Sequence, residues 1–259
     1  MKQRIITAVI ALLALLGVLF YAPQELALGV IVVVMLAGAW EWSAFLGAQG
    51  NAMRAVYVAI IAALLAAVTL LEIDATRVFQ AALAWWLVAL GWTFFFPTPI
   101  PAVVRWLAGA FVLVPLYLAL IVLYQAGAEL LLFALLIVWV ADTGAFFAGK
   151  FLGRVKLAPD ISPGKTWEGV IGGLVAVVLL TLLRTTWAET DLAVLVPFCL
   201  AVACLSIVGD LTVSMFKRTS GLKDSGSLFP GHGGVLDRID SISAAAPLFA
   251  LGISWVGLS

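Results

Sequence analysis

The chain has 259 residues, of which 64% are hydrophobic and 11% are charged, and its mean hydropathy is +1.19. Soluble domains contain about 45–50% apolar and about 25% charged residues, so this composition excludes an ordinary soluble domain and indicates an integral membrane protein. The formal net charge is zero, with 14 basic and 14 acidic residues, which argues against a basic surface for nucleic acid.

Nine apolar runs come close to the length of about 20 residues that a membrane-spanning helix needs. We therefore predict an all-α polytopic membrane protein with about nine transmembrane helices, at 5–21, 26–46, 55–71, 78–96, 106–124, 130–147, 170–183, 192–209 and 241–258. We expect the first run to be a retained helix and not a cleaved signal peptide. Within one integrated membrane domain, we assign the first five spans to an N-terminal part (1–129) and the last four to a catalytic part (130–259).

The basic residues predict how the spans are oriented. With the N-terminus in the cytoplasm and nine alternating spans, 12 of the 14 Lys and Arg residues face the cytoplasm, and only Arg77 and Arg184 face outward. Cytoplasmic connections of membrane proteins carry such an excess of Lys and Arg. The two long polar segments, 148–169 and 210–240, then both lie on the cytoplasmic side, where nucleotides are found.

The polar segment 210–240 holds four of the basic residues, four of the acidic residues and the only histidine. If the eighth helix continues into it, Asp210, Ser214 and Lys217 share one helix face. Asp237 and Asp240 share a face at the start of the last span. Carboxylates at a membrane surface are costly to desolvate unless they are paired or bind a cation. Two interpretations stay open: a magnesium ion that holds phosphate oxygens, or ion pairs solvated at the interface.

A glycine-rich turn at 230–234 precedes Asp237. Glycine accepts positive φ angles freely, and turns of this kind expose backbone N–H groups that can cradle phosphate. His232 lies inside the turn, where a base, a phosphate donor and a structural hydrogen-bonding residue are all consistent with the sequence.

The other polar segment supplies a second set of residues. Asp142 lies at the end of the sixth apolar run, an expensive place for a carboxylate without a purpose. Ser162, Lys165 and Thr166 offer a charge and hydroxyl donors to phosphate, and Glu168 fits either the site or a helix-start cap. The segment is not a P-loop, because the four-residue spacing before Gly-Lys-Ser/Thr is absent and we expect no strand before it.

Glu41 is a charged residue inside the second apolar run, near its cytoplasmic end. A buried role near the site and snorkelling of the carboxylate to the interface fit its position equally well.

The motifs together resemble a known family. Ser214-x-x-Lys217-Arg218, Lys223-Asp224 and His232-Gly233-Gly234-x-x-Asp237-Arg238-x-Asp240 are similar to the signature of the phosphatidate cytidylyltransferases, or CDP-diacylglycerol synthases. Asp142-x-x-Ala145 and Ser162-Pro-x-Lys165-Thr166-x-Glu168-Gly169 also resemble that family's pattern.

The resemblance implies transfer of CMP from CTP to phosphatidic acid, which gives CDP-diacylglycerol and pyrophosphate, with Mg²⁺ as cofactor. It also implies a bacterial inner-membrane protein that works on membrane lipid, with its site facing the cytoplasm, and it suggests a homodimer. Other hypotheses are a CTP-dependent polyprenol or lipid kinase and, in a different class, a lipid or ion transporter. A transporter is disfavoured because its substrate site would lie near the midplane of the membrane.

Within this family reading, we expect Asp210 and Asp237 to ligate Mg²⁺, with Asp240 in support or on a second cation. The residues expected to carry the chemistry are Asp210, Asp237, Asp240, Lys217 and Arg218. Those expected to bind substrate are Asp142, Ser162, Lys165, Thr166, Glu168, Ser214, Lys223, Asp224, His232, Gly233, Gly234 and Arg238.

Overall fold

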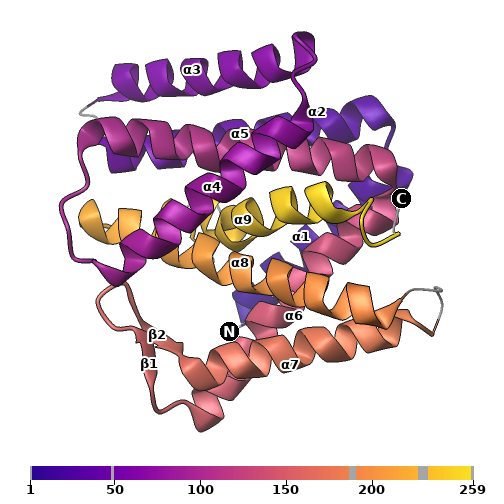
Figure 1. Cartoon of the computed structure of the whole chain (residues 1–259). Coiled ribbons are helices and arrows are strands. Elements are labelled where there is room, and N and C mark those ends of the chain that lie inside the picture. The colour runs from indigo at the N-terminus through magenta and orange to yellow at the C-terminus, as the bar shows by residue number, and fades with distance from the viewer. Residues whose placement is uncertain (1, 48–49, 187–190, 227–232, 258–259) are drawn as a thin grey trace.

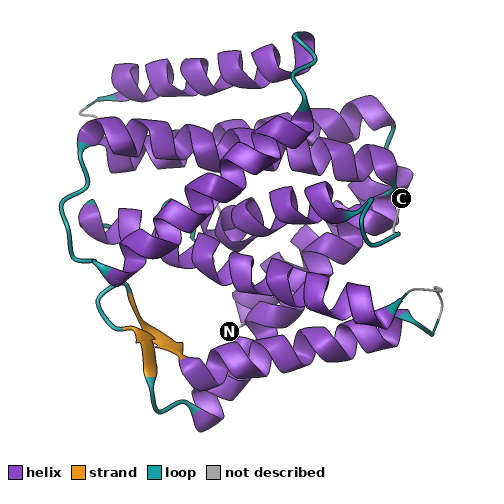
Figure 2. Ribbon diagram, in the orientation of Figure 1, coloured by secondary structure: helices purple, strands orange, loops and turns teal. Residues whose placement is uncertain are grey.

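The structure is a computed structural model that describes residues 2–47, 50–186, 191–226 and 233–257. Over these residues it is a helical bundle with one small two-stranded hairpin (Figures 1 and 2). The elements are α1 (Lys2–Tyr21), α2 (Gln24–Trp42), the 3-10 helix η1 (Ser43–Leu46), α3 (Asn51–Leu70), α4 (Ala75–Phe94), α5 (Ala102–Ala126), α6 (Ala128–Leu152), β1 (Lys156–Ala158), β2 (Ser162–Thr166), α7 (Trp167–Arg184), α8 (Leu192–Thr219) and α9 (Leu236–Gly252).

Each of the nine predicted spans corresponds to one of these helices, which confirms the predicted all-α polytopic membrane architecture. Within the described residues, six helical segments are long and apolar enough to cross a membrane: α2 with η1, α3, α5, α6, α7 and α8. The chain is therefore an integral membrane protein. In Figure 1 the hairpin and the connection between α4 and α5 lie at the left end of the bundle, and the end of the chain lies at the right.

The predicted bounds of the last two spans differ from the observed helices. Helix α8 does not end with the apolar run at Gly209 but continues to Thr219. Helix α9 begins at Leu236, before the predicted start at Ser241, and ends at Gly252. Apolar runs mark what a membrane can bury, whereas a helix extends into polar sequence wherever its backbone hydrogen bonds continue. Much of the polar segment 210–240 is therefore helical.

The predicted absence of a strand before Ser162 was wrong. Strand β1 (Lys156–Ala158) pairs antiparallel with β2 (Ser162–Thr166), and Lys156 lies opposite Thr166. The motif Ser-Pro-Gly-Lys-Thr forms β2 itself. A three-residue strand is too short to leave a clear alternating pattern in the sequence. The spacing argument against a P-loop still applies.

Helix α9 lies in the middle of the bundle (Figure 1). It packs against α2, α4, α5, α6 and α8, and most of its residues are buried. A helix that is surrounded by other helices does not need an apolar surface toward lipid, so α9 can carry Asp237, Arg238, Asp240 and two serines. The central position of α9 places Asp240 and the two serines inside the protein, whereas Arg238 is exposed.

Helices α6 and α7 pack through glycines that leave no room for a side chain. A Cβ at Gly173 would lie 2.6 Å from the backbone oxygen of Ala141, and one at Gly144 would lie 2.8 Å from the Cβ of Ala176. Small residues allow membrane helices to approach this closely. This contact fixes α6, which carries Asp142, against α7, which follows directly after the hairpin.

We expect Gly173→Ala to destabilise the protein by about 1–3 kcal/mol, because the new methyl group forces the α6 and α7 backbones apart. The matched control is Gly91→Ala in α4, where a Cβ would meet no atom within 4 Å. There the helix should gain about 0.5–1 kcal/mol from the higher helix propensity of alanine. Thermal unfolding of both variants in one detergent measures the difference. Equal midpoints would show that the α6–α7 contact can open without cost.

Candidate active site

The continuation of α8 places three predicted residues on one helix face, as the sequence predicted for a continuing helix. Ser214 Oγ donates a hydrogen bond to Asp210 Oδ1 at 3.1 Å, one helical turn away. Lys217 lies one turn further on and is almost fully buried. The face from Asp210 to Lys217 is directed toward α9, the helix against which α8 packs closely.

Gly209 lets α8 and α9 approach each other next to Asp210. A Cβ at Gly209 would lie 2.5 Å from the backbone oxygen of Asp240 and 3.0 Å from the Cβ of Ala244. The close crossing places Asp210 and Asp240 near enough for their charges to interact. Two carboxylates that face each other across a helix crossing need cations near them.

Lys217 is the cation between the carboxylates of α9. Its Nζ lies 2.8 Å from Asp237 Oδ1 and 3.9 Å from Asp240 Oδ2. The three side chains are only 9–11% exposed. A buried ion pair of this kind is costly to desolvate. Removal of one partner strongly destabilises the protein, because the other charge stays buried without a counter-charge.

Asp237 is hydrogen-bonded through both carboxylate oxygens. Oδ1 accepts from Lys217, and Oδ2 accepts from the backbone N–H groups of Ser225 at 3.0 Å and Gly234 at 2.9 Å. Burial acts to raise the pKa of Asp237, but the bonds from Lys217, Gly234 and Ser225 outweigh it, so that the pKa lies below its usual value. Gly233 has φ +81°, a backbone conformation that favours glycine, and it brings the chain around this carboxylate.

The hairpin contacts the same end of α8. Lys165 Nζ of β2 pairs with Asp210 Oδ2 at 2.7 Å. Arg218 Nε donates to the backbone oxygen of Ile161, which precedes β2, at 3.1 Å. The two polar segments that are far apart in the sequence are therefore joined in the structure by two cation contacts.

Asp142 completes the acidic group from α6. The charges of Asp210, Lys165 and Arg238 all act on it. Together with Asp237 and Asp240 it lines one cavity of about 590 Å³. The rest of that cavity is largely apolar and is formed by side chains of α1, α2, α5, α6 and α9, among them Leu15, Val34, Leu120, Leu135 and Ile242.

The other predicted residues of the hairpin region shape its junction with α7. Thr166 is buried, and its hydroxyl accepts a hydrogen bond from the Gly169 N–H as the cap of α7. Glu168, which is partly exposed, accepts from the Val155 N–H at 3.2 Å, and this bond ties α7 to the chain before β1. Ser162 begins β2 opposite Ala158. Contacts of these three residues with phosphate stay a prediction.

Two further predicted residues form no part of the buried cluster. Lys223 and Asp224 lie exposed just after α8, and their contact with substrate stays a prediction. His232 lies outside the described residues, so its three possible roles stay open.

Glu41, for which the sequence left two roles open, is buried near the site. Its side chain is 6% exposed and contacts the residues that begin α9. A carboxylate within an apolar run was the signal for this role. Ser225, which binds both Glu41 and Asp237, carries no such signal, because a loop serine is common in any sequence.

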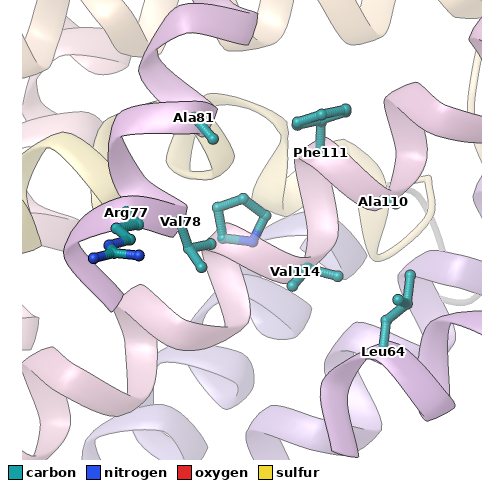
Figure 3. A pocket seen from close by; sticks show the side chains of 8 residues that line it. Leu64, Arg77, Val78, Ala81, Ala110, Phe111 and Val114 are labelled. Atoms are coloured by element: carbon teal, nitrogen blue, oxygen red, sulfur yellow. The ribbon is translucent and has the colours of Figure 1, made fainter. Parts of the chain in front are cut away.

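A second cavity, of about 340 Å³, lies between α3, α4 and α5 (Figure 3). Its lining is apolar apart from Arg77, and it contains none of the predicted site residues. Arg77 is itself exposed and paired with Asp74 at 3.4 Å. The cavity therefore offers no group for chemistry.

The carboxylates fit a divalent cation only if other ligands join them. Over the described residues, no three side chains of His, Cys, Asp or Glu group closely enough to hold a metal ion. Mg²⁺ typically takes one or two protein carboxylates and completes its coordination with phosphate and water. Asp210 and Asp240, whose charges interact across Gly209, supply such a pair.

A family profile and two of the known proteins below match nearly the whole chain, and a third protein matches about half of it. The sequence profile of the cytidylyltransferase family matches residues 2–256. A phosphatidate cytidylyltransferase of Pseudomonas aeruginosa is 42% identical over 259 residues, which cover 96% of either chain. One of Haemophilus influenzae is 35% identical over 281 residues, covering 96% of this chain and 97% of the relative. One of Staphylococcus saprophyticus is 43% identical over 124 residues, or 47% of this chain and 48% of the relative.

Full-length matches of this kind, together with the carboxylate and lysine cluster at the crossing of α8 and α9, assign the chain to the cytidylyltransferase family.

Proposed function

We propose that the chain is a phosphatidate cytidylyltransferase, which transfers CMP from CTP to phosphatidate and releases pyrophosphate. The observation that carries this proposal is the cavity of about 590 Å³, whose apolar part leads to Asp142, Asp237, Arg238 and Asp240. A lipid with a phosphate headgroup matches both parts of the cavity. The names of the full-length relatives agree with this substrate.

The apolar part of the cavity would hold the acyl chains of phosphatidate. Its side chains come mostly from α1, α2 and α5, in the N-terminal half of the chain. Burial of apolar surface there supplies binding energy and sets how far the headgroup reaches toward α9. The N-terminal helices thereby contribute to substrate binding, and the C-terminal helices supply the polar groups.

The basic residues would hold the phosphates of both substrates. Lys165 and Lys217 already neutralise carboxylates of the site, and Arg238 lines the cavity. In the reaction a phosphate oxygen of phosphatidate attacks the α-phosphorus of CTP. A new P–O bond forms, the bond between the α-phosphorus and its bridging oxygen breaks, and pyrophosphate leaves. Catalysis of such a transfer rests mainly on positioning and on neutralisation of charge.

In place of the pair Asp210 and Asp237 expected from the sequence, we propose that Asp210 and Asp240 would hold Mg²⁺, because their charges interact across Gly209. Asp237 would lie beside them or bind a second cation. When bound, the ion neutralises phosphate charge and draws electron density from the oxygens it contacts. Lys165 and Lys217 bind these carboxylates in the described structure. The same two lysines would also bind phosphate oxygens of the substrates.

We also propose that the end of the bundle with the hairpin faces the cytoplasm of a bacterial inner membrane. The excess of Lys and Arg in the connections at this end supports that orientation. CTP would then reach the site from the cytoplasm, and the lipid would reach it from the membrane. A homodimer stays a prediction.

Purified protein that is incubated with labelled CTP, Mg²⁺ and phosphatidic acid should form a lipid-soluble cytidine product and release pyrophosphate. Removal of Mg²⁺ with a chelator should abolish product formation, and added Mg²⁺ should restore it. A polyprenol kinase would instead phosphorylate polyprenol and release CDP. Absence of cytidine-labelled lipid in the presence of folded protein would refute the proposal.

A further inference from the structure

The buried carboxylate of Glu41 binds the start of α9 from a different part of the chain. Glu41 lies near the end of α2. Its Oε1 accepts a hydrogen bond from the Val235 N–H at 3.0 Å, and its Oε2 accepts one from the Leu236 N–H at 2.8 Å. Oε2 also accepts from Ser225 Oγ at 2.9 Å. One side chain therefore accepts hydrogen bonds from Ser225, Val235 and Leu236.

These contacts cap α9. The first N–H groups of a helix have no partner within the helix, and the helix dipole favours a negative charge at that end. Helix α9 has no side-chain cap from its own N-cap residue, Val235. Glu41 supplies the missing acceptors and the charge from α2. The position of α9 along its axis is thereby tied to α2.

Glu41 and Asp237 both accept hydrogen bonds from Ser225. The Ser225 hydroxyl donates to Glu41, and the Ser225 N–H donates to Asp237. A Cβ added at Gly226 or at Gly234 would overlap the Glu41 carboxylate. The glycines allow the chain to close around Glu41, and both carboxylates then hold it in place.

We propose that Glu41 is a positioning residue for the active site, which acts by fixing the start of α9 and with it Asp237 and its partner Lys217. This inference rests on the proposed cytidylyltransferase activity. Glu41 does not line the cavity that contains Asp237 and Asp240, so its effect passes through its bonds to Ser225, Val235 and Leu236 and involves no contact with substrate.

A glutamine cannot replace this carboxylate. The three partners of Glu41 all donate, and both carboxylate oxygens accept from them. A glutamine side chain has one accepting oxygen and an NH₂ group that can only donate. In Glu41→Gln the NH₂ group would therefore face one of the buried donors, and that N–H or hydroxyl group would have no acceptor.

The test compares Glu41→Gln with Glu25→Gln in detergent-purified protein. Glu25 lies on the same helix but is exposed and belongs to no part of the site. Loss of a residue that orients catalytic groups typically costs about 10–100-fold in activity. We expect kcat of Glu41→Gln to fall by that factor, with KM for CTP changed less than kcat, and Glu25→Gln to match the wild type.

Hydrogen exchange followed by mass spectrometry supplies the readout that does not depend on activity. Amides of 223–226 and 233–237 should exchange faster in Glu41→Gln, whereas those of α3 and α5 should keep the wild-type rate. Faster exchange throughout the molecule, unchanged exchange in these two stretches, or kcat within twofold of the wild type would each overturn the proposal.

Ser225→Ala is the second variant if Glu41→Gln does not fold. It removes one of the three donors and should give a smaller change of the same pattern. In the double variant the two effects should add to less than their sum, since both variants disturb the hydrogen bond from Ser225 to Glu41. Failure of the wild type to convert CTP and phosphatidate would refute the proposed activity alone. The exchange pattern would still test whether Glu41 holds the start of α9 in place.

Discussion

Asp237→Asn should lower kcat about a thousandfold, the upper end of what removal of one preorganised charged or polar group typically costs. Asp237 accepts from Lys217, Ser225 and Gly234 at once, and these bonds hold its pKa below the usual value. An asparagine keeps the shape but removes the charge and turns an NH₂ group toward a donor. Lys217 then loses its negatively charged partner, and the proposed arrangement of charges that positions the substrate phosphates is changed. Steady-state turnover of CTP with phosphatidate measures the effect.

Asp160→Asn is the matched control for this prediction. Asp160 is exposed in the hairpin connection between β1 and β2, and it belongs to no part of the proposed machinery. It should leave turnover and membrane insertion unchanged. Asp237→Asn should also insert and elute from a sizing column like the wild type. Near-normal turnover of Asp237→Asn would refute both the charge pattern and any role of Asp237 beside a cation.

Lys217→Met should damage both stability and activity. Its ammonium group is the one that neutralises Asp237 at 2.8 Å and approaches Asp240 at 3.9 Å in a nearly buried place. Removal of one partner of a buried ion pair typically costs about 3–5 kcal/mol, because the other charge stays desolvated. Turnover should fall at least about a hundredfold, since a cation that orders phosphate is lost. Thermal unfolding in detergent and CTP turnover report the two effects separately.

A double variant separates the two consequences of losing Lys217. Lys217→Met with Asp240→Asn removes a buried negative charge along with the cation, so part of the lost stability should return while activity stays low. Lys150→Met, at an exposed position near the end of α6, controls for loss of a lysine at the same end of the bundle. A midpoint of Lys217→Met equal to that of Lys150→Met would show that the pair is not desolvated.

The sequence predicts the helices of this protein better than their ends. Apolar runs locate the spans because lipid demands a continuous apolar stretch. They end where lipid contact ends, so they miss the part of α8 that runs past Gly209 to Thr219 and the first turn of α9. The hairpin was missed for a different reason. Strands of three and five residues at the edge of a bundle are held by contacts such as Lys165 with Asp210, which a local pattern does not contain.

For the site, residue type and spacing identified the members but not their partners. Asp210, Ser214 and Lys217 follow from helical spacing and share a face as expected. The pairing of Lys165 with Asp210 and of Lys217 with Asp237 depends on how the chain packs around the crossing of α8 and α9. Gly209 allows this close crossing because it has no side chain. Glu41 lies 194 positions from Val235, so only the folded chain reveals that they meet. The expectation that Asp210 and Asp237 ligate Mg²⁺, with Asp240 in support or on a second cation, stays a prediction; Asp210 pairs with Lys165, and Asp237 pairs with Lys217.

The central place of α9 has a consequence for biosynthesis. Helix α9 follows the other described helices in the chain, and with two aspartates, an arginine and two serines among its 17 residues it would partition poorly into lipid alone. Its neighbours α2, α4, α5, α6 and α8 all leave the ribosome before it. We expect α9 to enter a bundle that has already gathered, in the way a late subunit joins a complex. A nascent chain that stops before Leu236 would be embedded in the membrane yet hold no catalytic centre.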